Sequence, residues 1–167
     1  MTRSASTAWT TGAALALAAL LAPPTASAEP EKAAVFDFQL ANLAQLPPTE
    51  ADKARLPHLS DMLRQQLEAS GRYAVVPTTS FKDKVAGEDL SACGGCANDY
   101  AKSLGAKLAV TGQIQKVSNL ILNINVYIKD VTGNAPEQAY SVDIRGDNDE
   151  SFDHGIKYLV KHNILKQ

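Results

Sequence analysis

Two cysteines separated by two glycines are the residues of this chain best suited to chemistry. They form the segment Cys93-Gly94-Gly95-Cys96, a spacing used by disulfides, thiol–disulfide exchange centres and metal sites. A thioredoxin-type centre usually places its first cysteine at a helix start, directly after a strand. Here a polar loop precedes Cys93, and the helix is expected to start at or just after Cys96. We therefore favour a structural Cys93–Cys96 disulfide, with redox exchange and metal binding as the alternatives.

Three histidines could also bind a metal: His58, His154 and His162. His154 and His162 are eight residues apart and do not match the i, i+4 pair of a helical zinc site. A site could combine them with Cys93 and Cys96, but nothing in the spacing requires it. We expect all three histidines to be solvent-exposed helix residues, and we expect no metal and no cofactor.

The carboxylates offer little acid–base chemistry. Asp147, Asp149, Glu150 and Asp153 form an acidic cluster that fails the calcium-loop pattern, because its glycine and bidentate glutamate are missing or misplaced. Such residues favour the positive end of a helix dipole without any metal, so capping is the expected role. Asp37 ends a strand and is expected to accept hydrogen bonds from the following loop. With no Gly-x-Ser-x-Gly elbow and no phosphate-binding glycine loop, we predict no catalytic residue and no enzyme.

The first 28 residues indicate an exported protein. Arg3 precedes an apolar stretch from Ala13 to Ala22, and Ala26-Ser27-Ala28 offers the small residues that a signal peptidase needs. The stretch is too short to span a bilayer, so we expect a signal peptide over 1–28, cleaved after Ala28, and no membrane anchor after cleavage. Export to an oxidising compartment is compatible with a disulfide.

The remainder, residues 29–167, has the length of a single domain. The whole chain carries 16 basic and 18 acidic residues, and the leader removes only Arg3 among them. Basic residues are scattered along the sequence rather than gathered in a run. A mildly acidic chain without a basic stretch argues against a nucleic-acid partner.

Hydrophobic periodicity predicts the elements that must position these residues. Helices are expected over 56–70, 78–86 and 96–104 and from Asn148 or Asp149 onward, and strands over 33–38, 73–76, 108–117, 120–130 and 139–145. Thr79 or Ser80 is expected to cap the second helix, and Pro57 is expected in the first turn of the first. The fold class is α/β (α+β mixed), with a five-stranded mixed sheet and helices packed mainly on one face. The order is strand, helix, strand, helix, helix, three strands and a helix. The first two strands and the helix between them are expected to form a parallel crossover, and the last three strands an antiparallel meander. The last helix is expected to turn Phe152, Ile156, Leu159 and Val160 inward.

The strand over 120–130 carries the clearest alternation in the chain. Its apolar positions face one side, while Asn123 and Asn125 face the other, which indicates that this second face is at least partly wet. We expect the exposed sheet face with Asn123, Asn125 and Tyr127, together with any unpaired strand edge, to contact a partner.

Several short patterns occur in one order along the chain. They are Ala34-Val35-Phe36-Asp37-Phe38, a Leu-rich helix ending at Gly71, Tyr73-Ala74-Val75-Val76, the Cys93 and Cys96 pair, Leu104-Gly105-Ala106, Val110-Thr111-Gly112-Gln113-Ile114 and Asp130-Val131-Thr132-Gly133. This set resembles the TolB amino-terminal domain and CsgG-like envelope domains, and especially the small secreted bacterial proteins of unknown function with that fold. The chain lacks the propeller repeats of TolB and the lipidation cysteine and pore-forming strands of CsgG.

The resemblance implies a periplasmic module used for assembly or protein contact, with no catalytic residues to carry over. We therefore expect a secreted, non-enzymatic accessory or protein-binding module of the bacterial cell envelope, with an envelope or periplasmic protein as its partner. The alternatives are a periplasmic thiol–disulfide redox protein that uses Cys93 and Cys96, and a protein that binds a small ligand or a metal.

Overall fold

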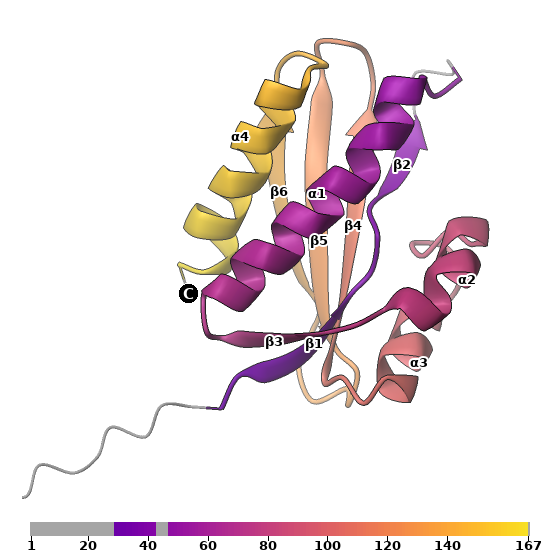
Figure 1. Ribbon diagram of the computed structural model, residues 1–167, viewed down its shortest axis with the longest axis vertical. Helices are drawn as coiled ribbons and strands as arrows, with labels where there is room; N and C mark the ends of the chain where they lie inside the picture. Colours follow the sequence, from indigo (N-terminus) through magenta and orange to yellow (C-terminus); the bar gives the residue numbers. More distant parts are fainter. Residues whose placement is uncertain (1–28, 43–46, 167) are drawn as a thin grey trace, which may run out of the picture.

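A mixed sheet forms the centre of the molecule. The computed structural model describes residues 29–42 and 47–166, and within these ranges six strands join one sheet in the order β3-β1-β4-β5-β6, with β2 also pairing with β4 (Figure 1). The strands are β1 (Glu31–Val35), β2 (Gln39–Asn42), β3 (Tyr73–Val76), β4 (Leu108–Lys116), β5 (Leu122–Asp130) and β6 (Gln138–Ile144). The predicted fold class is confirmed, and the described part of the chain adds one strand to the five expected.

The extra strand arises because the first predicted strand is interrupted. β1 and β2 both run parallel to β4, and residues 36–38 separate them. Phe36 packs on one face of the sheet and Phe38 on the other, so an uninterrupted period-two strand cannot hold both. The backbone N–H of Phe38 donates to Ser60 Oγ at 2.9 Å instead of to a neighbouring strand. The segment after Phe38 was expected to be a loop, and its described beginning forms β2 instead.

Helix α1 (Glu50–Ala69) connects β1 to β3, which pair in parallel as predicted. The helix begins six residues before the predicted Leu56, because Thr49 and Asp52 form a capping box that satisfies the first backbone N–H groups. Pro57 therefore lies inside the helix rather than in its first turn, so that expectation was wrong. A stripe of fully buried leucines at helical spacing faces the sheet: Leu59, Leu63 and Leu67.

Strands β4, β5 and β6 form the predicted antiparallel meander. The apolar side chains of β5 pack into the main core, as their alternation indicated. Leu120 was expected in this strand, but it lies outside β5 and is 72% exposed in the turn that follows β4.

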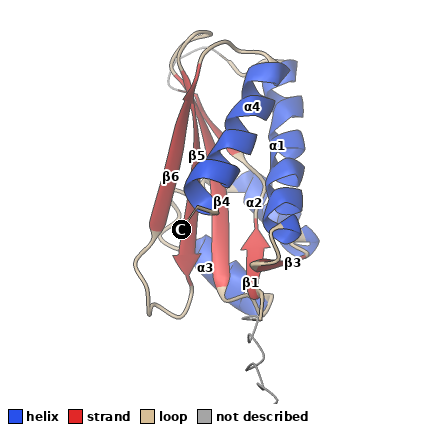
Figure 2. Ribbon diagram, turned by 90° about the vertical axis from the view of Figure 1, so that its left-hand side faces the viewer, coloured by secondary structure: helices blue, strands red, loops and turns tan. Residues whose placement is uncertain are grey.

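The helices cover the two faces of the sheet unequally (Figures 1 and 2). On one face α1 packs beside α4 (Asp149–Leu159), which continues as the π-helical segment η2 (Val160–Ile164). The inner side of α4 is the predicted one, since Phe152, Ile156 and Leu159 are all buried in the main core. Asn148 caps this helix by accepting from the backbone N–H of Ser151 at 2.9 Å.

A smaller layer covers the opposite face over β1 and β4. It contains a 3₁₀ turn η1 (Thr79–Phe81), the short helix α2 (Lys82–Gly87) and α3 (Cys96–Ser103). Helices were expected mainly on one face, and the two long helices do lie on one face, while this second layer is smaller. Its helix α3 packs on the sheet through small side chains, among them Ala97 and Ala101. Neither Thr79 nor Ser80 caps α2, whose N-cap residue is Phe81 and makes no side-chain capping bond.

Two further expectations concern the leader and membrane-spanning segments. The leader over 1–28 is outside the described residues. Within the described ranges, none of the helices combines the length and the apolar character that crossing a bilayer would require.

Candidate functional site

A polar sheet face lies opposite α1 and α4, beyond the part that α3 covers. Strand alternation places polar side chains of β4, β5 and β6 on this face in three registered rows. The rows are Thr111–Tyr127–Ala139, Gln113–Asn125–Ser141 and Gln115–Asn123–Asp143. We call these nine residues the polar face. It includes all three residues that the sequence pointed to as a contact surface.

Asn123 is tied into this face by two hydrogen bonds. Its Nδ2 donates to Asp143 Oδ1 at 2.6 Å, and its Oδ1 accepts from Ser141 Oγ at 2.9 Å. Both partners belong to β6, the neighbouring strand. The amide of Asn123 is therefore fixed in orientation, and it remains partly accessible at the surface.

Asn125 differs from the expectation of an exposed residue. It is only 7% exposed, because its short side chain lies in the central strand of the face between Gln113 and Ser141. Its Nδ2 is buried and has no hydrogen-bond partner among the described residues. An unpaired buried donor destabilises a folded protein by about 1–3 kcal/mol, so the amide of Asn125 is a point of local destabilisation within this face.

A hollow of about 360 Å³ adjoins the polar face on the side of α3. Tyr127 and Lys129 form one wall, and Gly94 and Gly95 of the cysteine loop form another. The hollow thus brings the predicted contact residue Tyr127 next to the cysteine pair, which lies more than thirty residues earlier in the chain.

The cysteine pair sits at the start of α3. The two sulfurs lie 1.94 Å apart, which is bonding distance, and their Cα atoms are 5.7 Å apart. Gly94 and Gly95 both adopt positive φ, at 71° and 109°, which explains why glycines rather than side-chain residues separate the cysteines. Cys96 begins the helix and Cys93 precedes it, the reverse of the thioredoxin arrangement.

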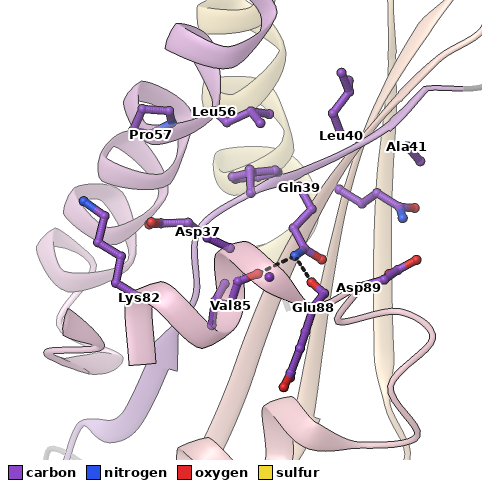
Figure 3. Close-up of a pocket in the computed structure, with 14 residues that line it drawn as sticks. Asp37, Gln39, Leu40, Ala41, Leu56, Pro57, Lys82, Val85, Glu88 and Asp89 are labelled. Atoms are coloured by element: carbon purple, nitrogen blue, oxygen red, sulfur yellow. Dashed lines mark hydrogen bonds between the residues drawn. The ribbon is translucent and has the colours of Figure 1, made fainter. Parts of the chain in front are cut away.

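A cleft of about 580 Å³ lies between α1, β2 and α2 (Figure 3). Gln39 forms its floor: its Nε2 donates to the carbonyls of Val85 at 2.9 Å and Glu88 at 2.6 Å, as the dashed lines of Figure 3 show. Its Oε1 accepts from the backbone N–H of Leu90 at 2.9 Å. All the polar atoms of this side chain are thus used to hold α2 and the loop after it against β2.

Asp37 lines the same cleft, and its partner is not the one expected. Its Oδ1 accepts from Arg64 of α1 at 2.5 Å, rather than from the loop that follows it. The same guanidinium donates to the carbonyl of Val35 from Nε at 3.1 Å and from Nη2, the nitrogen that also bonds to Asp37, at 2.9 Å. Asp37 therefore helps to anchor the interruption between β1 and β2.

The histidines do not come together with the cysteines. His154 is on α4 and His162 on η2, which pack on the opposite side of the sheet from α3. His58 pairs with Asp153 at 2.9 Å, and His154 lies 3.8 Å from Glu150. In the described part of the chain, no group of three or more histidine, cysteine or acidic side chains is arranged to hold a metal.

Two members of the acidic cluster belong to an ionic network that the sequence did not reveal, and the network is largely buried except at Asp149, which is 82% exposed. Lys116 Nζ bonds to Asp52 at 3.0 Å and to Asp147 at 2.5 Å. Arg55 bonds to Asp147 at 2.7 Å and to Asp149 at 2.9 Å, with its guanidinium over the Phe152 ring. We call the five charged residues the ionic network. Their positions in sequence are too far apart for spacing alone to pair them, although a lysine on the apolar face of β4 was a signal.

Hydrogen bonding decides the ionisation of this network. Burial alone would raise the pKa of Asp52, but hydrogen bonds from Thr49 and Lys116 outweigh it and hold the pKa below its usual value. Burial alone would lower the pKa of Lys116, but its bonds to Asp147 and Asp52 outweigh that effect and raise it. Both groups therefore remain charged at neutral pH, and the network links α1, β4 and the start of α4.

Fold and surface together define a small mixed α/β domain with one sheet face under two long helices and a polar face left open beyond α3. The family model of DUF3280, described as a protein of unknown function (DUF2380), matches residues 31–164, and the chain belongs to this family. None of the curated proteins matches the chain.

Solved structures share the fold at low identity. The LpoB C-terminal domain from Salmonella enterica superposes with a TM-score of 0.52 at 12% identity, over 72% of this chain and 87% of that one. The lipoprotein GNA1162 from Neisseria meningitidis gives a TM-score of 0.50 at 13% identity, over 78% of this chain and 96% of that one. These likenesses concern the fold, and they give no support to the narrower resemblance to TolB and CsgG.

Proposed function

We propose that this protein is a non-enzymatic accessory module of the bacterial cell envelope, which acts in the periplasm by binding another envelope protein. The leader over 1–28 supports export. The fold shared with a lipoprotein from Neisseria meningitidis supports an envelope setting. A fold alone does not define a function, so the proposal depends on a surface of this chain.

The observation that carries the proposal is the polar face. Its side chains stand in registered rows on β4, β5 and β6, with amide side chains on β4 and β5. A protein partner would contact the accessible groups of this face. These include the amide of Asn123, which is held in a fixed orientation, and the ring of Tyr127, an amphipathic side chain of the kind that is enriched at protein interfaces.

Site-specific photo-crosslinking in the periplasm tests this proposal. A benzoylphenylalanine placed at Tyr127 should yield one defined adduct with a second envelope protein. The matched control is the same amino acid at Lys53, an exposed position on α1. Adducts at both positions, or at neither, would contradict a partner on the polar face.

The cysteine pair supports a second candidate, a thiol–disulfide exchange protein. The observation in its favour is that Cys96 begins α3, where the helix dipole stabilises a thiolate. An insulin-reduction assay separates the two functions. Turnover that disappears in Cys96→Ala would establish the redox function, whereas equal background rates for both proteins favour the binding module.

A further inference from the structure

The outer edge of β6 borders a shallow groove on the side of α4. β6 is the last strand of the sheet and pairs only with β5 among the described strands. Figure 2 views the molecule from this side, with β6 outermost and α4 running beside it. The groove has a volume of about 580 Å³ and lies between the second half of β6 and the flank of α4 and η2. It is on a different surface from the hollow beside α3.

The edge offers backbone groups to an incoming strand. Backbone groups of alternate residues in an edge strand point away from the sheet. Asn163 of η2 donates to the carbonyl of Ser141 at 3.4 Å, which indicates that Ser141 is one of the outward residues. Ala139 and Asp143 share its direction by alternation, and all three are exposed. The strand has neither a proline nor a lysine to block pairing.

The groove beside this edge is positively charged. Arg145, Lys157 and Lys161 line it. Asp143 also lines the groove, where it accepts from the Asn123 amide, and Glu150 lies 3.8 Å from His154. The lining therefore carries three basic residues against one carboxylate. This local excess of positive charge contrasts with the formal net charge of −2 for the whole chain.

An aromatic side chain completes the groove. Tyr158 is 54% exposed and contacts the His162 ring, with the centroids 4.7 Å apart and the ring planes tilted by 30°. Along α4 and η2 the positions 154, 158 and 162 fall on one helical stripe, so the ring pair lies along the groove rather than across it. It offers a flat apolar surface to side chains of a bound strand.

We propose that the β6 edge binds an extended acidic peptide segment of another protein, which pairs with β6 and directs its carboxylates to Arg145, Lys157 and Lys161. An open edge alone would fit any strand, and a basic groove alone would fit any polyanion. Their side-by-side arrangement selects a ligand with both a free backbone and acidic side chains. This docking site uses the outer backbone edge of β6, whose residues Ala139, Ser141 and Asp143 also belong to the polar face, and it goes beyond the proposed function.

Peptide binding to the purified protein tests the inference. The probe is a fluorescent peptide of alternating glutamate and valine, as long as β6, measured by anisotropy at low salt. The double variant Lys157→Glu/Lys161→Glu should bind it about tenfold more weakly or worse, since two attractive charges become repulsive. The matched control, Lys53→Glu/Lys102→Glu, makes the same change in net charge at exposed lysines of α1 and α3 and should bind as the unaltered protein does.

Two further measurements isolate the contribution of the strand edge. The same peptide with alternate backbone nitrogens methylated keeps its charge but cannot pair, and it should bind about tenfold more weakly. Ala139→Pro removes one outward N–H and should weaken the unmodified peptide similarly, provided that its circular dichroism is unchanged. A polar-face variant, Tyr127→Ala, should bind the peptide normally, so failure of the proposed function would not alter this result.

Three results would overturn the inference. The first is undetectable binding of the acidic peptide to the unaltered protein. The second is equal binding of the methylated and unmethylated peptides, which would assign the groove to polyanions in general. The third is self-association of the free protein that Ala139→Pro abolishes, which would assign the edge to a second copy of this chain.

Discussion

Phe38 and Gly112 show how a single contact shapes this sheet. A Cβ built on Gly112 would lie 2.4 Å from the Phe38 ring, and its φ is not in the left-handed region, so the glycine is needed for space rather than for conformation. We predict that Gly112→Ala lowers the free energy of unfolding by about 1–3 kcal/mol, because either the ring or β4 must shift. Urea unfolding at equilibrium measures the change.

Gly87→Ala provides the matched control for that substitution. A Cβ at Gly87 would meet no atom within 4 Å, and the residue ends a short helix. Its stability should remain within about 0.5 kcal/mol of the unaltered protein. Equal stabilities for the two alanine variants would show that packing of the Phe38 ring does not require a glycine at position 112.

The cysteine pair leads to a second prediction at the level of residues. Protein isolated from the periplasm without reductant should contain no reactive thiol, because Cys93 and Cys96 form a disulfide and an oxidising compartment preserves it. Their ring spans only four residues, so a Cys93→Ser/Cys96→Ser double variant should lose about 2 kcal/mol or less of unfolding free energy. Thiol titration of the native protein and urea unfolding check the two statements. Two reactive thiols in the native sample would contradict the first.

The sequence predicts which side chains of the candidate site share one face of the sheet, but it does not predict how exposed each of them is. The alternation of β5 correctly put Asn123, Asn125 and Tyr127 on one face. It could not reveal that Asn125 is buried while Asn123 remains accessible, because that difference depends on which side chains of β4 and β6 lie in register beside each amide. Register between strands is a long-range property, and periodicity within one strand does not contain it.

At the level of elements, local signals were sufficient where side chains alternate or recur along one segment. The buried stripe of α1, the inner face of α4 and the meander all follow from such patterns. The start of α1 was misplaced because its capping box, Thr49 and Asp52, lies in a stretch with two prolines nearby. The break between β1 and β2 was missed because Phe36 and Phe38 both look like core residues, and only the two-sided packing separates them.

The ionic network joins three elements, so its loss should affect the whole fold. Lys116 lies on β4 and neutralises Asp52 of α1 and Asp147 before α4. Lys116→Met should lower the unfolding free energy by about 1–3 kcal/mol at neutral pH, because it removes the bonds from Nζ to two carboxylates and leaves Arg55 as their remaining cationic partner. Lys53→Met, at an exposed pair with Glu50, should change it by less than about 1 kcal/mol. Urea unfolding of both variants provides the comparison.

The pH dependence of stability gives a separate test of the same network. The folded-state pKa of Asp52 is below its unfolded value of 3.8, so its contribution is present above pH 3.8 and is lost as the pH falls through the folded pKa. The folded-state pKa of Lys116 is above 10.5, so its contribution is present below pH 10.5 and is lost as the pH rises through the folded pKa. The stability difference between the unaltered protein and Lys116→Met should therefore shrink at both extremes. A difference that stays constant with pH would contradict an ionic origin.

For the whole molecule, the two layers of helices divide the surface into separate regions. α1 and α4 bury one face of the sheet, while α2 and α3 cover only part of the other. What is left is the polar face on β4, β5 and β6 and the basic groove along the outer edge of β6. Because β6 contributes to both, a partner could engage the two surfaces together without any change in the fold, and the avidity would depend on how its segments are connected.

The last prediction concerns the molecule as it is made in the cell. The described fold starts with β1 at Glu31, two residues after the expected cleavage position, so removal of 1–28 would leave every described strand and helix intact. Protein recovered from the periplasm should begin at Glu29 by intact mass, since Ala26 and Ala28 provide the small side chains that signal peptidase requires. Ala28→Asp should give a species that retains the leader, whereas Thr25→Ser, outside the small-residue pair, should be processed normally. A mature form that starts within β1 would refute the expected cleavage position. Full-length protein in the cytosol would refute both the leader and the periplasmic setting of the proposed function.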